Sequence, residues 1–274
     1  QGDQVVQLKM DKTRVAINGA AGRMGRRLIA LATADAELDV VAALEHGEHA
    51  ELGADAGPIA GIGRIGVPLS AALTADAQAV IDFSVPAGAE AALRLCLERS
   101  IPLVAATTGL SDQQKATVEA AAEKIPIVWA PNMSLAVNLT MKLAEVAASA
   151  LNGNAGGTDV EIIERHHRYK QDAPSGTALH FGKLIAAIMG QKQHTHGRQG
   201  MIGQRPGDEI GYHALRVGDN PGEHTIVFGL LGETIELTVR ATNRDCYALG
   251  ALAAAKFIAR QTAGLYGMHD VLGL

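Results

Sequence analysis

The chain has 274 residues, 47% of them hydrophobic, and a formal net charge of −5. This composition fits one or two globular domains and argues against disorder. The acidic balance argues against a general affinity for nucleic acid or for an anionic membrane. It does not argue against a local basic pocket. No apolar run is long enough to span a bilayer. Aromatic residues make up only 3%, so the core must be built from Ala, Val, Ile and Leu.

Two cysteines, Cys96 and Cys246, lack the spacing of metal ligands, so we expect two small, buried hydrophobic residues. Reduced thiols in such a chain favour a cytoplasmic location. Residues 1–9 are polar and precede Met10. We expect this stretch to be disordered or foreign to the native chain, and we leave it out of the fold.

Strand-like and helix-like segments alternate through the first half of the chain. Strands are expected at 14–18, 38–44, 79–83, 101–106 and 126–130. Helices are expected at 24–34, from about 86 to 99 and at 111–124, and the glycine-rich stretch 47–68 is expected to be a loop. This alternation predicts an α/β domain with a mostly parallel, doubly wound sheet.

The pattern changes near residue 134. Helices are expected at 135–151, 175–190 and 246–261, strands at 158–164, 210–217, 222–230 and 233–241, and a long polar loop at 191–208. We therefore predict a dinucleotide-binding domain over 1–134 and a smaller α+β domain over 135–244. The segment 245–274 is too apolar to stand alone, and we expect it to return to the first domain.

A glycine-rich turn joins the first predicted strand to the first predicted helix. It has the spacing G-x-x-G-x-x-G over residues 19–25, with Ala21 where the common dinucleotide fingerprint has its middle glycine. Glycines let the backbone approach a pyrophosphate, and the helix N-terminus offers free N–H groups to the anion. The turn therefore predicts a dinucleotide site, with a bare tight turn as the alternative.

Glu45 follows the second predicted strand, about 20 residues beyond the last glycine of the turn. A carboxylate at this place usually accepts the adenosine ribose hydroxyls, which favours NADH; a solvated strand-end carboxylate is the alternative. Neighbouring His46 and the turn's Arg23 would instead suit the 2′-phosphate of NADPH. The choice between NADH and NADPH stays open.

Two further loops follow predicted strands, at residues 107–109 and 130–132. In an open α/β sheet, ligands bind at the carboxyl ends of the strands, so these loops are candidates to hold the nicotinamide end of the cofactor. Ordinary strand-to-helix turns explain them equally well.

A polar segment at residues 166–177 carries the densest chemistry. His166 and Lys170 are candidates for proton transfer, because histidine titrates near neutral pH and cationic neighbours help a lysine to release its proton. Ser175-Gly176-Thr177 is typical of a helix start, capped by Ser175 or Thr177, and such a start binds carboxylates through backbone N–H groups. The segment predicts reduction of a C=C or C=N bond in an anionic carboxylate. A polar loop before a capped helix is the alternative.

We expect no metal site in this segment. Adjacent His166 and His167 point in different directions, and no nearby cysteine or carboxylate completes a ligand set. His194 and His196 fall in the predicted polar loop and are expected to be surface residues.

The polar segment and its flanks resemble the 4-hydroxy-tetrahydrodipicolinate reductase (dihydrodipicolinate reductase) family. The resemblance lies in the runs Glu161 to Glu164, His166 to Lys170 and Asp172 to Ala178, and in residues 19–25, 82–84, 107–109, 131–132 and 222–225. It covers nearly the whole chain from residue 13. It implies a Rossmann-like domain, a smaller mixed-sheet domain and a homotetramer built through the second domain's sheet. It also implies reduction of a cyclic dicarboxylate with NADH or NADPH, on the diaminopimelate route to lysine.

The resemblance assigns roles to individual residues. His166 would be a proton donor and acceptor, and Lys170 the proton donor. Substrate contacts would come from His167, Gly176 and Thr177. The residues that would line the cofactor site are Gly19, Ala20, Ala21, Gly22, Arg23, Met24, Glu45, His46, Ala106, Thr107, Thr108, Ala130, Pro131, Asn132 and Met133.

Three residues depart from the family pattern. His46 stands where some members carry arginine, and Ala21 and Ala106 stand where glycine is common. These departures bear on cofactor preference and affinity.

Two other functions stay open. One alternative is another two-domain reductase that acts on a different carboxylate. The other is a nucleotide-binding protein without catalytic activity. The clamp beside Lys170 disfavours the first, and the intact pair of His166 and Lys170 disfavours the second.

Overall fold

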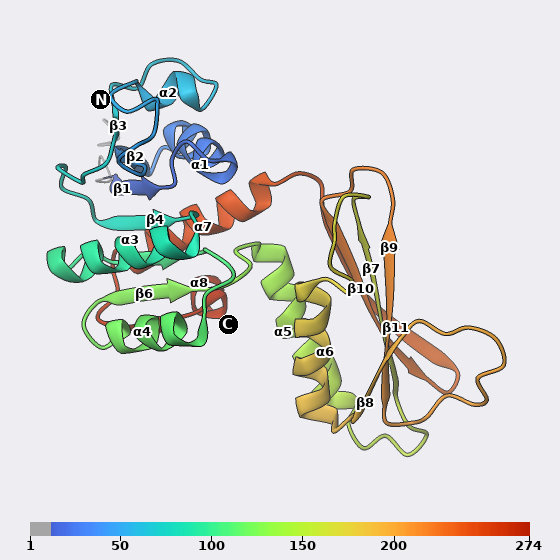
Figure 1. Ribbon diagram of the computed structural model, residues 1–274. Coiled ribbons are helices and arrows are strands. Elements are labelled where there is room, and N and C mark those ends of the chain that lie inside the picture. Colours follow the sequence, from blue (N-terminus) through green and yellow to red (C-terminus); the bar gives the residue numbers. More distant parts are fainter. Residues whose placement is uncertain (1–11) are drawn as a thin grey trace, which may run out of the picture. The chain divides into compact units, whose positions relative to one another are not determined.

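The computed structural model describes residues 12–274, so the stretch 1–9 lies outside the described residues. The described chain divides into two compact units. One unit contains residues 12–133 and 247–273, and the other contains residues 134–246. Figure 1 shows the elements of each unit.

The first unit is built on a seven-stranded sheet in the order β12-β6-β5-β4-β1-β2-β3, with every pairing parallel. Its strands are β1 (Thr13–Asn18), β2 (Leu38–Leu44), β3 (Leu69–Ser70), β4 (Ala79–Asp82), β5 (Leu103–Ala105), β6 (Pro126–Trp129) and β12 (Gly264–Tyr266). The strand order reverses at β1, which has β2 on one side and β4 on the other. Parallel sheets of this kind bind ligands at that point, outside the carboxyl ends of their strands.

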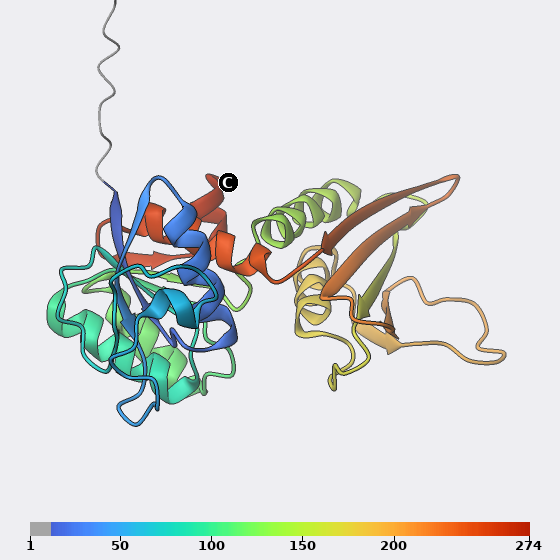
Figure 2. The ribbon, with the colours of Figure 1, turned by 90° about the horizontal axis from the view of Figure 1, so that it is seen from above.

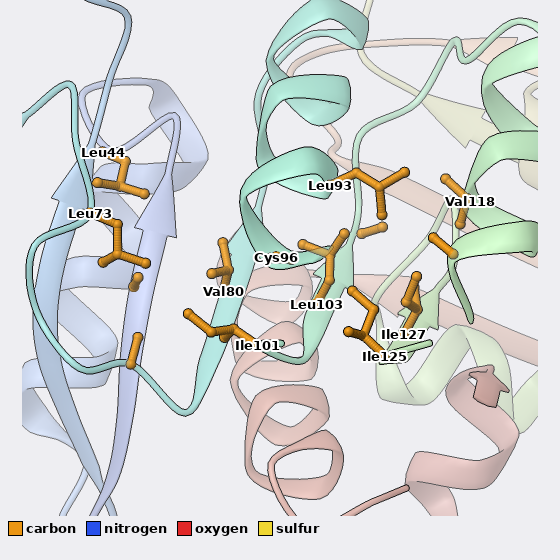
Figure 3. Close-up of a cluster of buried hydrophobic side chains, with 14 of the residues drawn as sticks. Leu44, Leu73, Val80, Leu93, Cys96, Ile101, Leu103, Val118, Ile125 and Ile127 are labelled. Carbon is orange, nitrogen blue, oxygen red and sulfur yellow. The ribbon is translucent and has the colours of Figure 1, made fainter. Parts of the chain in front are cut away.

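Helices cover both faces of this sheet (Figures 1 and 2). They are α1 (Arg23–Ala34), α2 (Ala56–Ile59), α3 (Pro86–Arg99), α4 (Asp112–Ala122), α7 (Asp245–Ile258) and α8 (Met268–Leu272). Side chains alternate along each strand, so Val80 joins Leu93 and Val118 in the aliphatic core under α3 and α4, drawn in Figure 3. Its neighbour Ile81 is equally buried outside that cluster. The predicted doubly wound α/β sheet is confirmed.

The two cysteines have different surroundings. Cys96 is fully buried in the core under α3 and α4, where burial raises the pKa of its thiol to about 12. Cys246 is only half-buried, because it lies at the start of α7, where its thiol donates to the backbone oxygen of Asn243. Both are free. The expectation of a buried small residue therefore holds for Cys96 and is wrong for Cys246.

The second unit is a mixed five-stranded sheet in the order β11-β10-β7-β9-β8. Its strands are β7 (Asp159–His166), β8 (Gln193–His196), β9 (Glu209–Arg216), β10 (Gly222–Leu230) and β11 (Glu233–Ala241). Two helices, α5 (Leu135–Leu151) and α6 (Gly176–Met189), pack on one face, around Phe181, Phe228 and Ile162 (Figure 2). No helix of this unit covers the opposite face.

Three segments differ from the sequence predictions. The expected loop 191–208 contains β8, an edge strand that pairs in parallel with β9. Its two histidines are exposed as expected, and they stack on Tyr212. A polar edge strand lacks the alternation of apolar residues that marks a half-buried strand. The expected loop 47–68 contains the single turn α2, and the expected tail adds β12 and α8. These elements are short, so they carry little periodicity.

Candidate functional site

The turn between β1 and α1 is packed so closely that two of its glycines have no room for a side chain. Gly19 has φ +76°, and a Cβ there would lie 2.9 Å from the backbone oxygen of Phe83. A Cβ on Gly25 would lie 2.1 Å from the backbone oxygen of Gly19. Gly22 precedes α1 and provides no side-chain cap, so side chains do not take the first N–H groups of the helix. The turn therefore fits a pyrophosphate approaching the helix start.

Glu45 lies against this turn. One carboxylate oxygen accepts from the N–H of Ala21 at 3.2 Å, and the other accepts from the N–H of His46 at 3.1 Å. His46 is exposed, and its ring lies edge to face with that of His49. A carboxylate and a histidine thus lie at the end of β2, beside the turn. The donors and acceptors present here fit an adenosine ribose.

The carboxyl ends of β1, β4 and β5 are joined by one buried carboxylate. Asp82 is fully buried, and it accepts from Asn18 Nδ2 at 2.7 Å, Ser84 Oγ at 2.6 Å and Thr107 Oγ1 at 2.6 Å. Thr107 is a predicted cofactor residue, whereas the sequence alone suggested no role for Asp82. Its signal was an acid that directly follows the apolar residues Ala79 to Ile81.

The other predicted cofactor residues lie at the same edge of the sheet. Ala106 is buried, and its N–H donates to the backbone oxygen of Asp82 at 3.0 Å. Thr108 and Pro131 are exposed, whereas Ala130 and Met133 are buried. Because parallel strands end at one edge, the turn after β1 shares an edge with the loops after β5 and β6. Together these residues fit a dinucleotide lying along the carboxyl ends of the strands.

In the second unit, His166 is the last residue of β7, not part of a loop after it. It is 8% exposed, and its Nδ1 lies 2.6 Å from Oε2 of Glu164. Burial lowers the pKa of His166, and Glu164 opposes that shift. Charged Lys170 and Arg216 lower the pKa further. The imidazole is therefore kept neutral near physiological pH, in a state that can accept a proton.

Glu164 is a buried carboxylate that the sequence analysis did not assign. It is 1% exposed. Its carboxylate accepts hydrogen bonds from both terminal nitrogens of Arg216 at 2.8 Å and from the backbone N–H of Ser175 at 3.0 Å. Burial raises the pKa of Glu164, but the hydrogen bonds from Arg216 and His166 outweigh it and leave the pKa below its usual range. Alternation along β7 carried the signal, because Glu164 shares the buried face with Val160 and Ile162.

Lys170 lies in the loop after β7. Its Nζ is 2.8 Å from Oδ1 of Asp172, and its side chain is 21% exposed. Its backbone N–H donates to the oxygen of His167 at 3.1 Å. Nδ1 of His167 is buried and has no hydrogen-bond partner among the described residues. The lysine ammonium and an unused imidazole nitrogen thus lie on the short loop that follows His166.

Ser175 caps α6, and Thr177, the other predicted cap, does not. Ser175 Oγ accepts from the N–H of Ala178 at 3.2 Å and lies 2.9 Å from Nε2 of His224. A Cβ on Gly176 would meet no atom within 4 Å, so the helix start is open on that side. An accessible first turn, with a positive dipole end, suits a carboxylate.

His224 is a further residue to which the sequence alone assigned no role. It lies on β10 directly opposite Glu164, and its ring meets that of His166 edge to face at 5.2 Å. Burial lowers its pKa to about 4, so the ring is neutral at physiological pH. The arrangement therefore combines a neutral imidazole, an ammonium group and a helix start open to an anion.

The fold and the two sets of residues define a class of protein, the two-domain nicotinamide-dependent oxidoreductases. Comparison with known families narrows this class. Residues 13–133 match the family described as "Dihydrodipicolinate reductase, N-terminus", and residues 136–272 match "Dihydrodipicolinate reductase, C-terminus". The chain belongs to the dihydrodipicolinate reductase family, whose members use NADH or NADPH.

Individual relatives agree with this assignment. The chain is 57% identical, over 94% of its length and 95% of the relative's, to a 4-hydroxy-tetrahydrodipicolinate reductase of Rhodopirellula baltica. It is 49% identical to the enzyme of that name from Alkalilimnicola ehrlichii, over 96% of this chain and 99% of the relative. A solved structure, dipicolinate-bound dihydrodipicolinate reductase from Paenisporosarcina sp. TG-14, has a TM-score of 0.77 at 27% identity and covers 94% of this chain and 99% of that one.

Proposed function

We propose that this chain reduces the 4-hydroxy-tetrahydrodipicolinate/dihydrodipicolinate intermediate to tetrahydrodipicolinate, with NADH or NADPH as reductant, in lysine biosynthesis through diaminopimelate. The observation that carries the proposal is His166, held by a buried carboxylate, on the segment that bears Lys170 and the open start of α6. Family membership and the dipicolinate-bound relative support a cyclic dicarboxylate as the substrate.

When bound, the nicotinamide would supply the hydride. For each hydride added to the C=C or C=N bond, one proton must reach the substrate. Lys170 is the donor of that proton, and Asp172 holds its ammonium group at 2.8 Å. His166 donates and accepts a proton through Nε2, because Nδ1 is committed to Glu164. Lys170 therefore delivers the balancing proton, aided by proton exchange at His166.

The remaining residues bind. His167, Gly176 and Thr177 contact the substrate, with the first turn of α6 holding a carboxylate. The cofactor site consists of the residues that the sequence analysis named, from Gly19 to Met24, Glu45 and His46, Ala106 to Thr108 and Ala130 to Met133. Asp82 fixes the ends of β1, β4 and β5 beneath that site.

We also propose a homotetramer formed through the uncovered face of the second unit's sheet. That face presents the half-exposed apolar side chains of Ile163 and Leu215. The described residues contain no helix long and apolar enough to cross a membrane. Two cysteines that form no disulfide among the described residues support a cytoplasmic location as part of the proposal.

The test is product analysis with isotope labels. Purified protein is given the intermediate and a cofactor deuterated at the transferable position, in ordinary water. We expect tetrahydrodipicolinate that carries one deuterium from the cofactor, with the balancing proton drawn from solvent. Absence of this product while the cofactor is consumed on another keto or imino acid would favour a different reductase. Tight cofactor binding with no product from any such acid would favour a binding protein.

A further inference from the structure

The buried face of the second unit's sheet changes character at one end. Along β7, buried Val160 and Ile162 are followed on the same face by Glu164 and His166. On the neighbouring strands, His224 of β10 lies opposite Glu164, and Arg216 of β9 lies opposite His166. An apolar core thus gives way to a cluster of charged and titratable groups from three neighbouring strands. A cluster this expensive to bury calls for a function.

Glu164 uses both carboxylate oxygens fully. Oε2 accepts from His166 Nδ1 at 2.6 Å and from Arg216 at 2.8 Å. Oε1 accepts from the N–H of Ser175 at 3.0 Å and from the other terminal nitrogen of Arg216 at 2.8 Å. Arg216 also donates to the backbone oxygen of Asp172. One carboxylate therefore links the imidazole, the cap of α6 and the loop that bears Lys170.

The first consequence concerns which nitrogen of His166 carries the proton. A carboxylate accepts hydrogen bonds and cannot donate them, so the neutral ring must carry its hydrogen on Nδ1. Nε2 is then the bare nitrogen that exchanges a proton with the substrate. A Cβ on Gly222 would lie 3.0 Å from that Nε2, so glycine leaves the nitrogen the most room.

The second consequence concerns the helix start. Ser175 is fixed at two points, through its N–H by Glu164 and through its Oγ beside Nε2 of His224. Gly176 and Thr177 follow it directly as the first residues of α6. The position of the anion-binding N–H groups therefore depends on the carboxylate that also orients His166.

We propose that Glu164 is a positioning residue that sets both parts of the site at once: it fixes His166 with Nε2 free, and it fixes the start of α6 that receives a substrate carboxylate. Arg216 is the counter-ion that keeps this carboxylate charged. The proposal rests on the proposed function for its kinetic part only, because the tautomer of His166 is a property of the free protein.

The test uses nitrogen-15 NMR of the histidine side chains, which distinguishes the two neutral tautomers and the imidazolium. We expect His166 of the wild-type protein to be in the Nδ1–H form, the minor form for histidine in water. Glu164→Gln should weaken the preference for that form, because an amide offers one acceptor oxygen where the carboxylate offers two, and its NH2 group can face Nδ1 instead. It should also lower the pKa of His166, because the negative charge goes while the cationic Lys170 and Arg216 remain and His224 stays neutral. A His166→Asn variant assigns the signal.

Kinetics of the same variant supply the second readout. We expect Glu164→Gln to lower kcat by about 10- to 100-fold, less than loss of the whole acid–base group. We expect KM for the dicarboxylate to rise by about 5-fold, the worth of one hydrogen bond at the helix start. Glu164→Asp, which keeps the charge, should restore part of kcat.

Glu161→Gln is the matched control. Glu161 lies on the same strand, bonded to Arg198, Arg205 and His213, but it does not contact His166. The variant removes a comparable charge and should leave the His166 tautomer, kcat and KM unchanged.

Three outcomes would overturn the proposal. An Nε2–H tautomer in the wild-type protein would do so even if Glu164→Gln failed to fold. An unchanged tautomer and unchanged kinetics in Glu164→Gln would show that the residue only packs. Equal losses in Glu164→Gln and Glu161→Gln would indicate a general loss of stability. Absence of turnover in the wild-type protein with the expected tautomer would count against the proposed reaction and leave the positioning intact.

Discussion

The predicted cofactor residues of the first unit and the predicted proton-transfer residues of the second unit are held in place by different kinds of group. In the first unit, backbone and small residues shape the turn after β1. Gly19 and Gly25 must be glycine there, because a Cβ on either would lie too close to backbone atoms. In the second unit, buried charges shape the site, and Glu164 connects His166, Ser175 and Arg216. The glycine turn should therefore be sensitive to an added side-chain atom. The charged cluster should be sensitive to the removal of a charge.

The largest effect should follow the loss of the proton donor. Lys170→Ala is expected to lower kcat by about two to four decades, the usual worth of a positioned acid, while cofactor binding stays near that of the wild type. Steady-state kinetics and a fluorescence titration with NADH measure the two quantities. Lys183→Ala removes an exposed lysine from α6 and should change neither. Full turnover in Lys170→Ala would refute the assignment.

The next effect should follow the addition of one methyl group to the turn. Gly25→Ala places a Cβ 2.1 Å from a backbone oxygen, so the turn must shift. Overpacking costs about 1–3 kcal/mol, and we expect the cofactor Kd to rise by about 5- to 150-fold. Gly63→Ala is the control, because a Cβ there would meet no atom within 4 Å. Normal cofactor affinity in Gly25→Ala would mean that the turn does not hold the pyrophosphate.

Cofactor choice should respond to a single charge. Glu45 lies against the turn, and its carboxylate would repel the 2′-phosphate of NADPH. In Glu45→Gln, the ratio of kcat/KM for NADPH to that for NADH should rise about tenfold. Parallel kinetics with both cofactors give the ratio. Glu48→Gln, an exposed carboxylate on the same loop, should leave it unchanged. An unaltered ratio in Glu45→Gln would place the adenosine ribose elsewhere.

The smallest effect should come from an ion pair that belongs to neither set of predicted site residues. Lys256 of α7 lies 2.7 Å from Asp35 and 2.6 Å from Glu37. Burial lowers the pKa of Lys256, but both carboxylates outweigh it and leave the pKa raised. Burial raises the pKa of Asp35, and the bond from Lys256 outweighs it and leaves that pKa lowered. Lys256→Met should reduce the free energy of unfolding by about 1 kcal/mol without changing turnover.

The pH dependence of that loss follows from the two directions. A lowered pKa of Asp35 gives stability that disappears as the pH falls through it, and a raised pKa of Lys256 gives stability that disappears as the pH rises through it. The difference between wild type and Lys256→Met should therefore be largest between about pH 5 and 9. Urea unfolding across that range measures it, with Lys115→Met, from an exposed pair, as the control. A difference that persists at about pH 2 would contradict the account.

The sequence predicted most of what depends on local pattern. The helix over 135–151 and the strands of the parallel sheet follow from periodicity, and the tight turn between β1 and α1 follows from its glycines. The edge strand β8 and the short strand β12 were not predicted. So few residues, polar in β8, show no alternation of apolar and polar side chains.

The missed site residues have a different cause. Glu164, Arg216 and His224 come from three strands, and they meet only because β7 pairs with β9 and β10 in a particular register. That register is set by the packing of the whole sheet, so no short stretch of sequence encodes the contact. His166 and Lys170 could be predicted because they lie within one segment. Glu164 was not predicted, although it is only two residues away from His166.

The most direct test of the central claim is to measure turnover of the 4-hydroxy-tetrahydrodipicolinate/dihydrodipicolinate intermediate by the wild-type protein. The rates with NADH and with NADPH are measured in parallel. The account predicts that cofactor is oxidised mole for mole with the substrate supplied, and that semialdehyde or amino-acid substrates support far less oxidation. Binding of the cofactor without oxidation on this intermediate, or faster oxidation on one of the other substrates, would contradict it.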